Sequence, residues 1–331
     1  WVRYVQLAQF LGLKYTIQEL RLPKDTLKSP QAMETVLHAI HNTSDGSHYA
    51  QFWKGETRPW YSLEIISIEG NVKFLIWTED RRKSNLKAAL YSQYPGIEIY
   101  EIPDYAQDFQ WDPKVWKIWA AEFSFTQEGH SNAYPIKTYV DYGLDKDPKE
   151  EFKVDPLVHM LEWLGSLRPN EQAWFQFVVR AHKKEQRKAG HFWKQTDVWK
   201  DEATALVNKI LMRDPVTKVS GSLEKQKIAG IFEEISKKPT ISRGEQEIAE
   251  AVERKLQKLP FDVCVRGVYI AKKDIFDTPF GIGGVISSMK QFNTEHMNGF
   301  RPNGDKWIAK FDHPWQDYKD IRRNYLSKRF M

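Results

Sequence analysis

The chain has 331 residues, of which 41% are hydrophobic and 28% charged, so its composition is that of a soluble fold long enough for two domains. Its 49 Lys and Arg residues against 44 Asp and Glu residues give a formal net charge of +5, which is compatible with contact to DNA or to an anionic membrane and requires neither. The single cysteine, Cys264, excludes an internal disulfide framework and a cysteine-based zinc site. No uninterrupted apolar run reaches the ~18 residues of a transmembrane helix.

The first 15 residues combine aromatic and basic side chains with near-helical spacing of their apolar positions. They read WVRYVQLAQFLGLKY, with Trp1 at the start and Arg3 and Lys14 as the basic residues. Such an opening is typical of the flank of a membrane span, so we expect residues 1–15 to be a juxtamembrane segment that follows an anchor. The alternative is an amphipathic helix that packs on the first domain.

Residues 16–104 predict the order strand, helix, strand, strand, helix, strand. The predicted strands are 16–22, 61–68, 72–78 and 97–102, and the predicted helices are 29–41 and 83–93. Ser29 followed by Pro30 is a helix start, and Glu69-Gly70-Asn71 joins the two central strands. This order is typical of the split βαβ, ferredoxin-like fold.

An aromatic stretch, residues 105–120, follows the first module and carries Trp111, Trp116 and Trp119. We expect it to be a linker between domains. Its tryptophans either pack between the domains or form a protein-interaction surface, and the sequence leaves both interpretations open.

A second module over residues 121–312 predicts a similar order. Its predicted strands are 121–126, 136–142, 171–181 and 261–271, and its predicted helices are 155–167 and 281–293. A charged insertion, 183–260, separates the last two strands and predicts helices at 203–212, 223–236 and 243–259. The sequence therefore predicts an α+β chain with two ferredoxin-like domains in tandem, the second with a long helical insertion, and a basic aromatic tail at 313–331.

The most basic stretch is residues 180–200, where lysines and arginines alternate with aromatic residues. Basic side chains release counterions from phosphates and aromatic rings stack on bases, but Glu185 and Asp197 dilute the charge. A solvated arm or partner-binding loop, a nucleic-acid contact and a membrane-surface contact all stay open. The candidate contacts are Arg180, Lys183, Lys184, Arg187, Lys188, Trp193 and Lys194, with Arg322 and Arg323 in the tail.

Motifs of catalysis are missing from the sequence. There is no GxxxxGK[ST] phosphate loop and no GxSxG elbow. His38 and His41 are three residues apart and His48 follows them, but a zinc site needs three or four ligands, so we interpret these as structural or surface histidines. His182 and His191 have no carboxylate at metal-ligand spacing. We therefore expect no cofactor, no metal and no enzymatic activity, and we expect Cys264 to be a small buried residue in a strand.

Six segments that span nearly the whole chain carry a family resemblance. They read LRLPKDTLKSPQAMETVLHAIH, RPWYSLEIISIEGNVKFLIWT, AALYSQYPGIEIYEIPDY, DPLVHMLEWLGSL, CVRGVYIAKKD, and MKQFNTEHMNGFRP with DHPWQDY. Together they resemble a membrane-associated family of Patescibacteria, the candidate phyla radiation, which is a domain of unknown function. Genes of that family accompany conjugation-like type IV secretion ATPases of the DNA-translocase class.

The resemblance implies a membrane segment just before the LRLPKD-like strand and a location on the cytoplasmic face of the cell membrane. It implies a scaffold subunit of a secretion or DNA-transfer apparatus, without enzymatic activity, that docks a partner ATPase or assembles with itself. The alternative function is a DNA-binding module that uses residues 180–200 and the tail. A metal-dependent or hydrolytic enzyme is a third interpretation, and a deep polar pocket with converging titratable groups would favour it.

Overall fold

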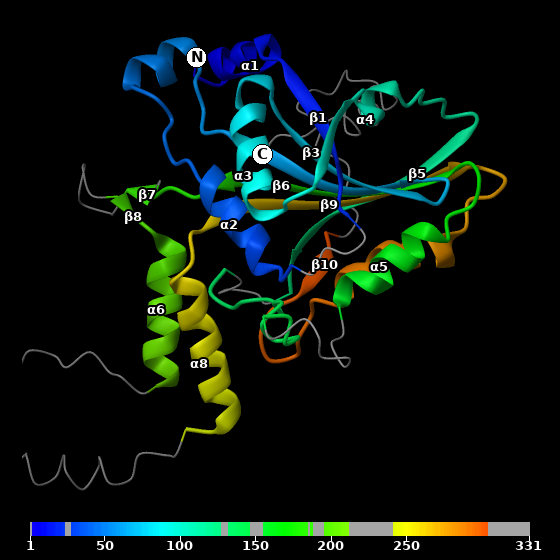
Figure 1. The fold of residues 1–331 in the computed structure, drawn as a ribbon. Helices are drawn as coiled ribbons and strands as arrows, with labels where there is room; N and C mark the ends of the chain where they lie inside the picture. Colours follow the sequence, from blue (N-terminus) through cyan, green and yellow to red (C-terminus); the bar gives the residue numbers. More distant parts are fainter. Residues whose placement is uncertain are drawn as a thin grey trace, which may run out of the picture.

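An eight-stranded antiparallel sheet forms the centre of the computed structural model of the chain (Figure 1). The structure describes residues 2–23, 28–126, 132–145, 155–184, 186–187, 195–211 and 241–303. These residues contain both helices and strands, so the predicted mixed α and β composition is confirmed.

The four strands of the first half lie in the order β4-β1-β3-β2, with antiparallel neighbours throughout. They are β1 (Tyr15–Arg21), β2 (Trp60–Ile68), β3 (Asn71–Glu79) and β4 (Glu98–Ile102). The β2–β3 hairpin turns at Glu69 and Gly70, whose φ angles are 54° and 82°. Positive φ at both positions gives the two-residue turn that matches the twist of the strands. A Cβ at Gly70 would lie 2.9 Å from the carbonyl oxygen of Gly165, which excludes other residues.

The second half has the strand order β6-β9-β5-β10, again antiparallel. Its strands are β5 (Trp116–Phe125), β6 (Glu171–Ala181), β9 (Phe261–Lys272) and β10 (Phe300–Pro302). The halves meet where β2 pairs with β6, from Trp60 opposite Arg180 to Ile68 opposite Gln172. The two predicted modules therefore share one continuous sheet, a pairing that the sequence expectation did not include.

Four helices cover one face of this sheet. They are α2 (Gln31–Ile40), α3 (Lys83–Gln93), α5 (Pro156–Gly165) and α9 (Gly283–Lys290). Successive side chains of a strand point to opposite faces of the sheet, and the side chains of β2 illustrate which residues lie on each face. Tyr61 packs with residues of α2 and α3, and Ile65 packs with residues of α5 and α9. Trp60 and Ile66 belong to the cluster on the other face.

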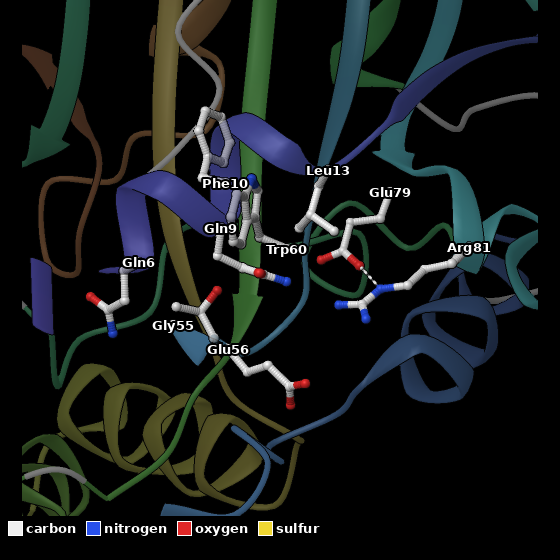
Figure 2. A pocket seen from close by; sticks show the side chains of 10 residues that line it. Gln6, Gln9, Phe10, Leu13, Gly55, Glu56, Trp60, Glu79 and Arg81 are labelled. Carbon is white, nitrogen blue, oxygen red and sulfur yellow. Dashed lines mark hydrogen bonds and ion pairs between the residues drawn. The ribbon is translucent and has the colours of Figure 1, made fainter. Parts of the chain in front are cut away.

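Helix α1 (Val2–Gly12) lies over that other face. The ring of Phe10 lies 5.7 Å from the ring of Trp60 and 5.3 Å from that of Tyr15. The crevice beneath α1, lined in part by Leu13 and Trp60, has a volume of about 10 Å³ (Figure 2), which is room for roughly one water molecule. α1 therefore packs closely on the sheet. Among the described residues, no helix combines the length and the apolar character needed to cross a bilayer.

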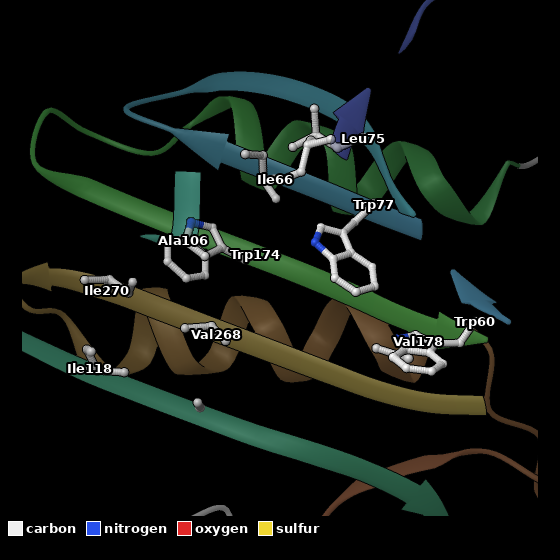
Figure 3. Packing of buried hydrophobic residues seen from close by; sticks show 12 residues of the cluster. Trp60, Ile66, Leu75, Trp77, Ala106, Ile118, Trp174, Val178, Val268 and Ile270 are labelled. Carbon is white, nitrogen blue, oxygen red and sulfur yellow. The ribbon is translucent and has the colours of Figure 1, made fainter. Parts of the chain in front are cut away.

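The aromatic stretch after β4 crosses the same face. Phe109, Trp111 and Trp116 pack against the cluster around Trp174, the centre of which is shown in Figure 3. Trp119 lies in β5 and packs against the cluster on the helix-covered face. All three candidate tryptophans are therefore partly buried inside the molecule, and β5 begins at Trp116, within the stretch predicted to be a linker.

Short helical elements complete the connections. They are η1 (Ala50–Lys54), η2 (Asp80–Arg82), α4 (Tyr105–Asp108) and η3 (Thr278–Ile282). The two-residue strands β7 (Gln186–Arg187) and β8 (Gln195–Thr196) pair with each other.

A helical arm leaves the sheet between β6 and β9 and extends away from it (Figure 1). Its helices are α6 (Val198–Ile210) and α8 (Arg243–Leu256), which bury Ala203, Val207 and Val252 between them. At its base the backbone N–H of His182 donates to the carbonyl oxygen of Pro260 at 3.0 Å. The helix expected at 203–212 is α6, which begins earlier, at Val198. The helix expected at 243–259 is α8, which ends earlier, at Leu256.

The strand predicted at 136–142 is wrong. These residues form coil and turns, because the carboxylate of Asp141 accepts hydrogen bonds from the backbone N–H and the hydroxyl of Thr138 at 2.7 and 2.8 Å. Such side-chain bonds favour a turn over a strand. The helix predicted at 223–236 and the tail at 313–331, with Arg322 and Arg323, lie outside the described residues.

Candidate binding surfaces

A hollow of about 820 Å³ lies between the arm and the ends of β6 and β9. Its size is within the range of small-molecule sites. Trp199 and Lys255 line it from the arm, Phe261 and Val263 line it from β9, and Phe125 lines it from the end of β5. The hollow is half open to solvent and lies between two separate parts of the fold, which makes it a candidate site in the described residues.

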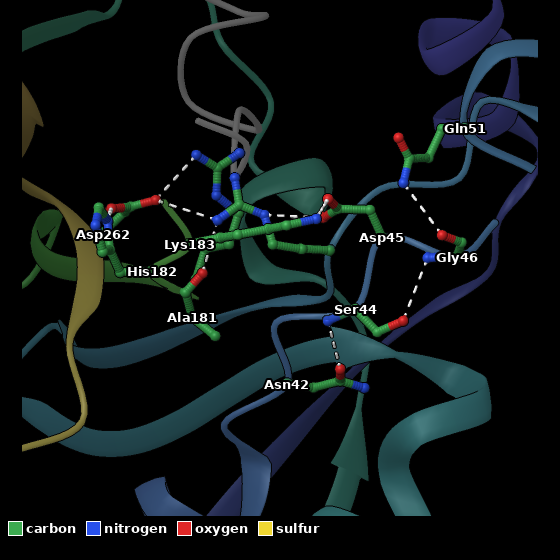
Figure 4. Close-up of polar contacts among 11 residues, drawn as sticks. Asn42, Ser44, Asp45, Gly46, Gln51, Ala181, His182, Lys183 and Asp262 are labelled. Carbon is green, nitrogen blue, oxygen red and sulfur yellow. Dashed lines mark hydrogen bonds and ion pairs between the residues drawn. The ribbon is translucent and has the colours of Figure 1, made fainter. Parts of the chain in front are cut away.

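A network of ion pairs joins the loop after α2 to the base of the arm (Figure 4). Arg58 is buried, and its guanidinium lies 3.0 Å from the carboxylate of Asp45 and 3.8 Å from that of Asp262. Arg180 donates to Asp262 at 3.1 Å, and Lys183 lies 2.5 Å from Asp45. Burial is the main cause that lowers the pKa of Arg58, with Arg180 adding repulsion and the two carboxylates opposing it.

His182 stands at the centre of this network. Its Nδ1 lies 2.6 Å from Asp262, and its Nε2 lies 3.1 Å from Asp197 at the start of α6. Both ring nitrogens therefore have a protein partner, and neither is directed at a substrate. The arm is held to the sheet by these contacts.

Of the titratable groups that line the hollow, His182, Lys183, Asp197 and Asp262 thus have protein partners in these ion pairs. The described lining contains no Ser or Cys, and the hydroxyl of its Thr138 donates to Asp141. Within the ranges that the structure describes, no group of three His, Cys, Asp or Glu side chains is placed to hold a metal ion. These ion pairs fix the position of the arm beside the hollow.

A second surface, here called the aromatic end, combines α1 with η1. Its side chains Tyr4, Tyr49, Phe52 and Trp53 are 71%, 64%, 46% and 64% exposed. The two elements touch directly, because a Cβ at Gly55 would lie 2.4 Å from the carbonyl oxygen of Val5. In Figure 1, α1 lies at the end of the molecule opposite to the arm.

The basic candidates from the sequence fall into three groups. Arg180 and Lys183 are engaged in the ion pairs of the body, and Lys184 is exposed. Arg187 lies in β7. The rest lie outside the described residues, namely Lys188, Trp193, Lys194, Arg322 and Arg323. A shared nucleic-acid face of these residues stays a prediction, and two of its members already have carboxylate partners.

Other residues of these surfaces were missed in the sequence. Lys255 sits in a charged helix, α8, and is its one lysine, and Trp53 sits in a loop that reads as polar. The signal that was available for the aromatic end is the run HYAQFWK, residues 48–54, which combines three large aromatics with a lysine and no acid. Nothing comparable marks Lys255, since its surroundings come from residues far away in the chain.

Comparison with known proteins identifies a family. A family model described as Domain of unknown function (DUF8128) matches residues 6–296. No curated protein matches the chain, and no solved structure does.

Proposed function

The chain belongs to the DUF8128 family, a domain family of unknown function, and from this premise we propose that it is a non-enzymatic scaffold module that rests on a membrane surface. The observation that carries the proposal is the aromatic end. Large aromatic residues, above all Trp and Tyr, gather at the headgroup level of bilayers, where their rings are half in the apolar region and half in water.

The charges of the aromatic end favour an anionic lipid surface as its partner. Residues 2–14 and 46–54 contain no Asp or Glu, and Lys14, His48 and Lys54 are exposed on them. Of the two acids that flank the second range, Asp45 is paired with Arg58 and Lys183, and Glu56 is half-buried. A cation near an anionic bilayer contributes about 1 kcal/mol, and each buried aromatic side chain contributes about 1.5–3 kcal/mol.

In its finer architecture the scaffold consists of two ferredoxin-like units fused through β2 and β6. The strand orders β4-β1-β3-β2 and β10-β5-β9-β6 support this interpretation, as do the matching positions of α2 and α5, and of α3 and α9, in the chain. The order of elements in each half agrees with the split βαβ motif that we propose for it. A fold of this kind carries no chemistry of its own, in agreement with a scaffold.

The family resemblance of the sequence extends the proposal to a cellular system. We propose the cytoplasmic face of the cell membrane as the location and a type IV secretion or conjugative apparatus of Patescibacteria as the assembly. The partner would be its motor ATPase or further copies of the chain. The missing phosphate-binding loop supports a role beside a motor rather than as one.

Vesicle flotation with the full chain tests the membrane contact. We expect the wild-type protein to float with phosphatidylcholine vesicles that contain phosphatidylglycerol, and less with pure phosphatidylcholine. The double variant Phe52→Ser/Trp53→Ser should bind at least ~10-fold more weakly, because it removes two interfacial rings.

Tyr91→Ser is the matched control, since Tyr91 is 49% exposed and belongs to α3 rather than to α1 or η1. It should float like the wild type. The proposal is wrong if the wild-type chain stays with the soluble fraction, or if the double variant floats as well as the wild type.

A further inference from the structure

Lys255 is the cation of the hollow that has no carboxylate partner among the described residues. Its Nζ donates to the backbone carbonyl oxygens of Asn132 at 2.6 Å and Tyr134 at 3.2 Å. The rings of Phe125 and Trp199 lie 5.8 and 5.7 Å from the same atom. Since an ammonium group has three donors, one hydrogen is left for a further acceptor.

The other cations on the wall of the hollow are neutralised by the protein. Arg254 lies 3.4 Å from Asp141, Lys258 lies 2.7 Å from Glu34, and Lys183 pairs with Asp45. Burial lowers the pKa of Lys255 to about 8, and no neighbouring carboxylate offsets that effect. At neutral pH this amine is therefore a positive charge that water solvates poorly, which is costly unless an anion approaches it.

The walls around Lys255 decide what kind of anion fits. Besides the aromatic rings, Val198, Leu259 and Val263 line the hollow and keep apolar surface exposed. A ligand with an apolar body would cover that surface. Asp197, Glu202 and Asp262 also line the hollow, so a doubly charged phosphate would meet more repulsion than a singly charged carboxylate.

We propose that the hollow between the arm and the sheet is a binding site for an organic monocarboxylate. Its carboxylate accepts a hydrogen bond from Lys255, and its apolar body lies against Trp199 and Val263. This site is independent of the membrane contact proposed above, because the lining of the hollow includes none of the exposed aromatic residues Tyr4, Tyr49, Phe52 and Trp53. Either proposal can therefore fail without the other.

Two isosteric probes test the site on the full chain. They are 3-(4-fluorophenyl)propionate and its uncharged primary amide, observed by fluorine NMR line broadening. We expect the carboxylate to bind the wild type in the millimolar range, as suits so small a ligand, and about 10-fold more tightly than the amide. Lys255→Gln should remove this preference.

Lys258→Gln is the matched control, because Lys258 lines the same hollow but is paired with Glu34. It should keep the preference for the carboxylate. If Lys255→Gln does not fold, Lys255→Met replaces it with a side chain of similar length and no charge.

A further binding experiment distinguishes a free acid from an acidic side chain as the source of the carboxylate. The blocked peptide acetyl-Gly-Phe-Glu-Gly-amide should bind more tightly than the propionate if the site takes an acidic side chain of a partner polypeptide, and more weakly if it takes a free acid. Equal binding of carboxylate and amide to the wild type would overturn the proposal, as would a preference that survives the loss of the Lys255 charge.

Discussion

Single buried charges in this chain are matched by several partners at once. Glu171, at the start of β6, is fully buried and accepts hydrogen bonds from the backbone and guanidinium of Arg168 and from the hydroxyl of Tyr269. Burial on its own would raise the pKa of Glu171, but these hydrogen bonds outweigh it, and the pKa is lowered. Buried carboxylates of this kind make stability depend on pH.

The sign of that dependence follows from the lowered pKa. Ionised Glu171 stabilises the folded state above the ordinary pKa of 4.5, and this contribution is lost as the pH falls through the lower, folded-state pKa. We expect Glu171→Gln to unfold about 1–3 kcal/mol more easily at pH 7 and to lose less stability than the wild type below about pH 4.5.

Denaturant titrations between pH 7 and pH 3 check this prediction. Glu250→Gln, at an exposed position on α8, is the control and should follow the wild-type curve. Parallel curves for the wild type and Glu171→Gln would contradict the assignment.

At the scale of elements, the arm is a small unit with its own core. Ser242 and Glu245 begin α8 with a capping box, in which the Ser242 hydroxyl accepts from the Glu245 N–H at 3.3 Å and the Glu245 carboxylate accepts from the Ser242 N–H at 2.9 Å. Only a few residues are buried between α6 and α8, among them Ala203, Val207 and Val252. A cap matters more where the core is this small.

We expect Ser242→Ala to destabilise the arm by about 1 kcal/mol while the sheet is unaffected. Hydrogen exchange reads both parts in one sample: amides of α8 should exchange faster, and amides of β2 and β6 should serve as the internal control. Faster exchange throughout the sheet would show instead that the arm and the sheet unfold together.

Local signals in the sequence account for the elements that were predicted well. Lys83–Gln93 and Glu171–Ala181 have the predicted bounds, and the start of α8 at Arg243 follows from the Ser242 cap. The strand predicted at 136–142 failed because β-rich composition there is overridden by the turn at Thr138 and Asp141. The pairing of β2 with β6 and the surroundings of Lys255 depend on contacts between distant residues, which no local pattern encodes.

For the whole molecule, the shared sheet makes the two halves one cooperative unit. The central cluster draws Ile17, Ile66 and Leu75 from the first half and Trp174 and Val268 from the second. Trp174 is 0% exposed and lies on β6, the strand that pairs with β2. A core that crosses the boundary couples the unfolding of both sides.

We therefore expect a single unfolding transition in calorimetry. Trp174→Ala should lower the free energy of unfolding by about 3–5 kcal/mol and shift that one transition as a whole. Val263→Ala, at a half-exposed position on β9, should move it much less. Two separate transitions, or a shift confined to one of them, would show that the halves unfold independently.

The connection between β6 and β9 is a position at which this fold accepts inserted residues. The chain leaves β6 and returns to β9 at neighbouring points, with His182 and Pro260 hydrogen-bonded, and the corresponding point of the first half holds only the Glu69-Gly70 turn. Material added between two such adjacent ends costs little loop entropy and leaves the strand register unchanged. The segment between His182 and Pro260 can therefore vary in length and surface while the sheet keeps its structure.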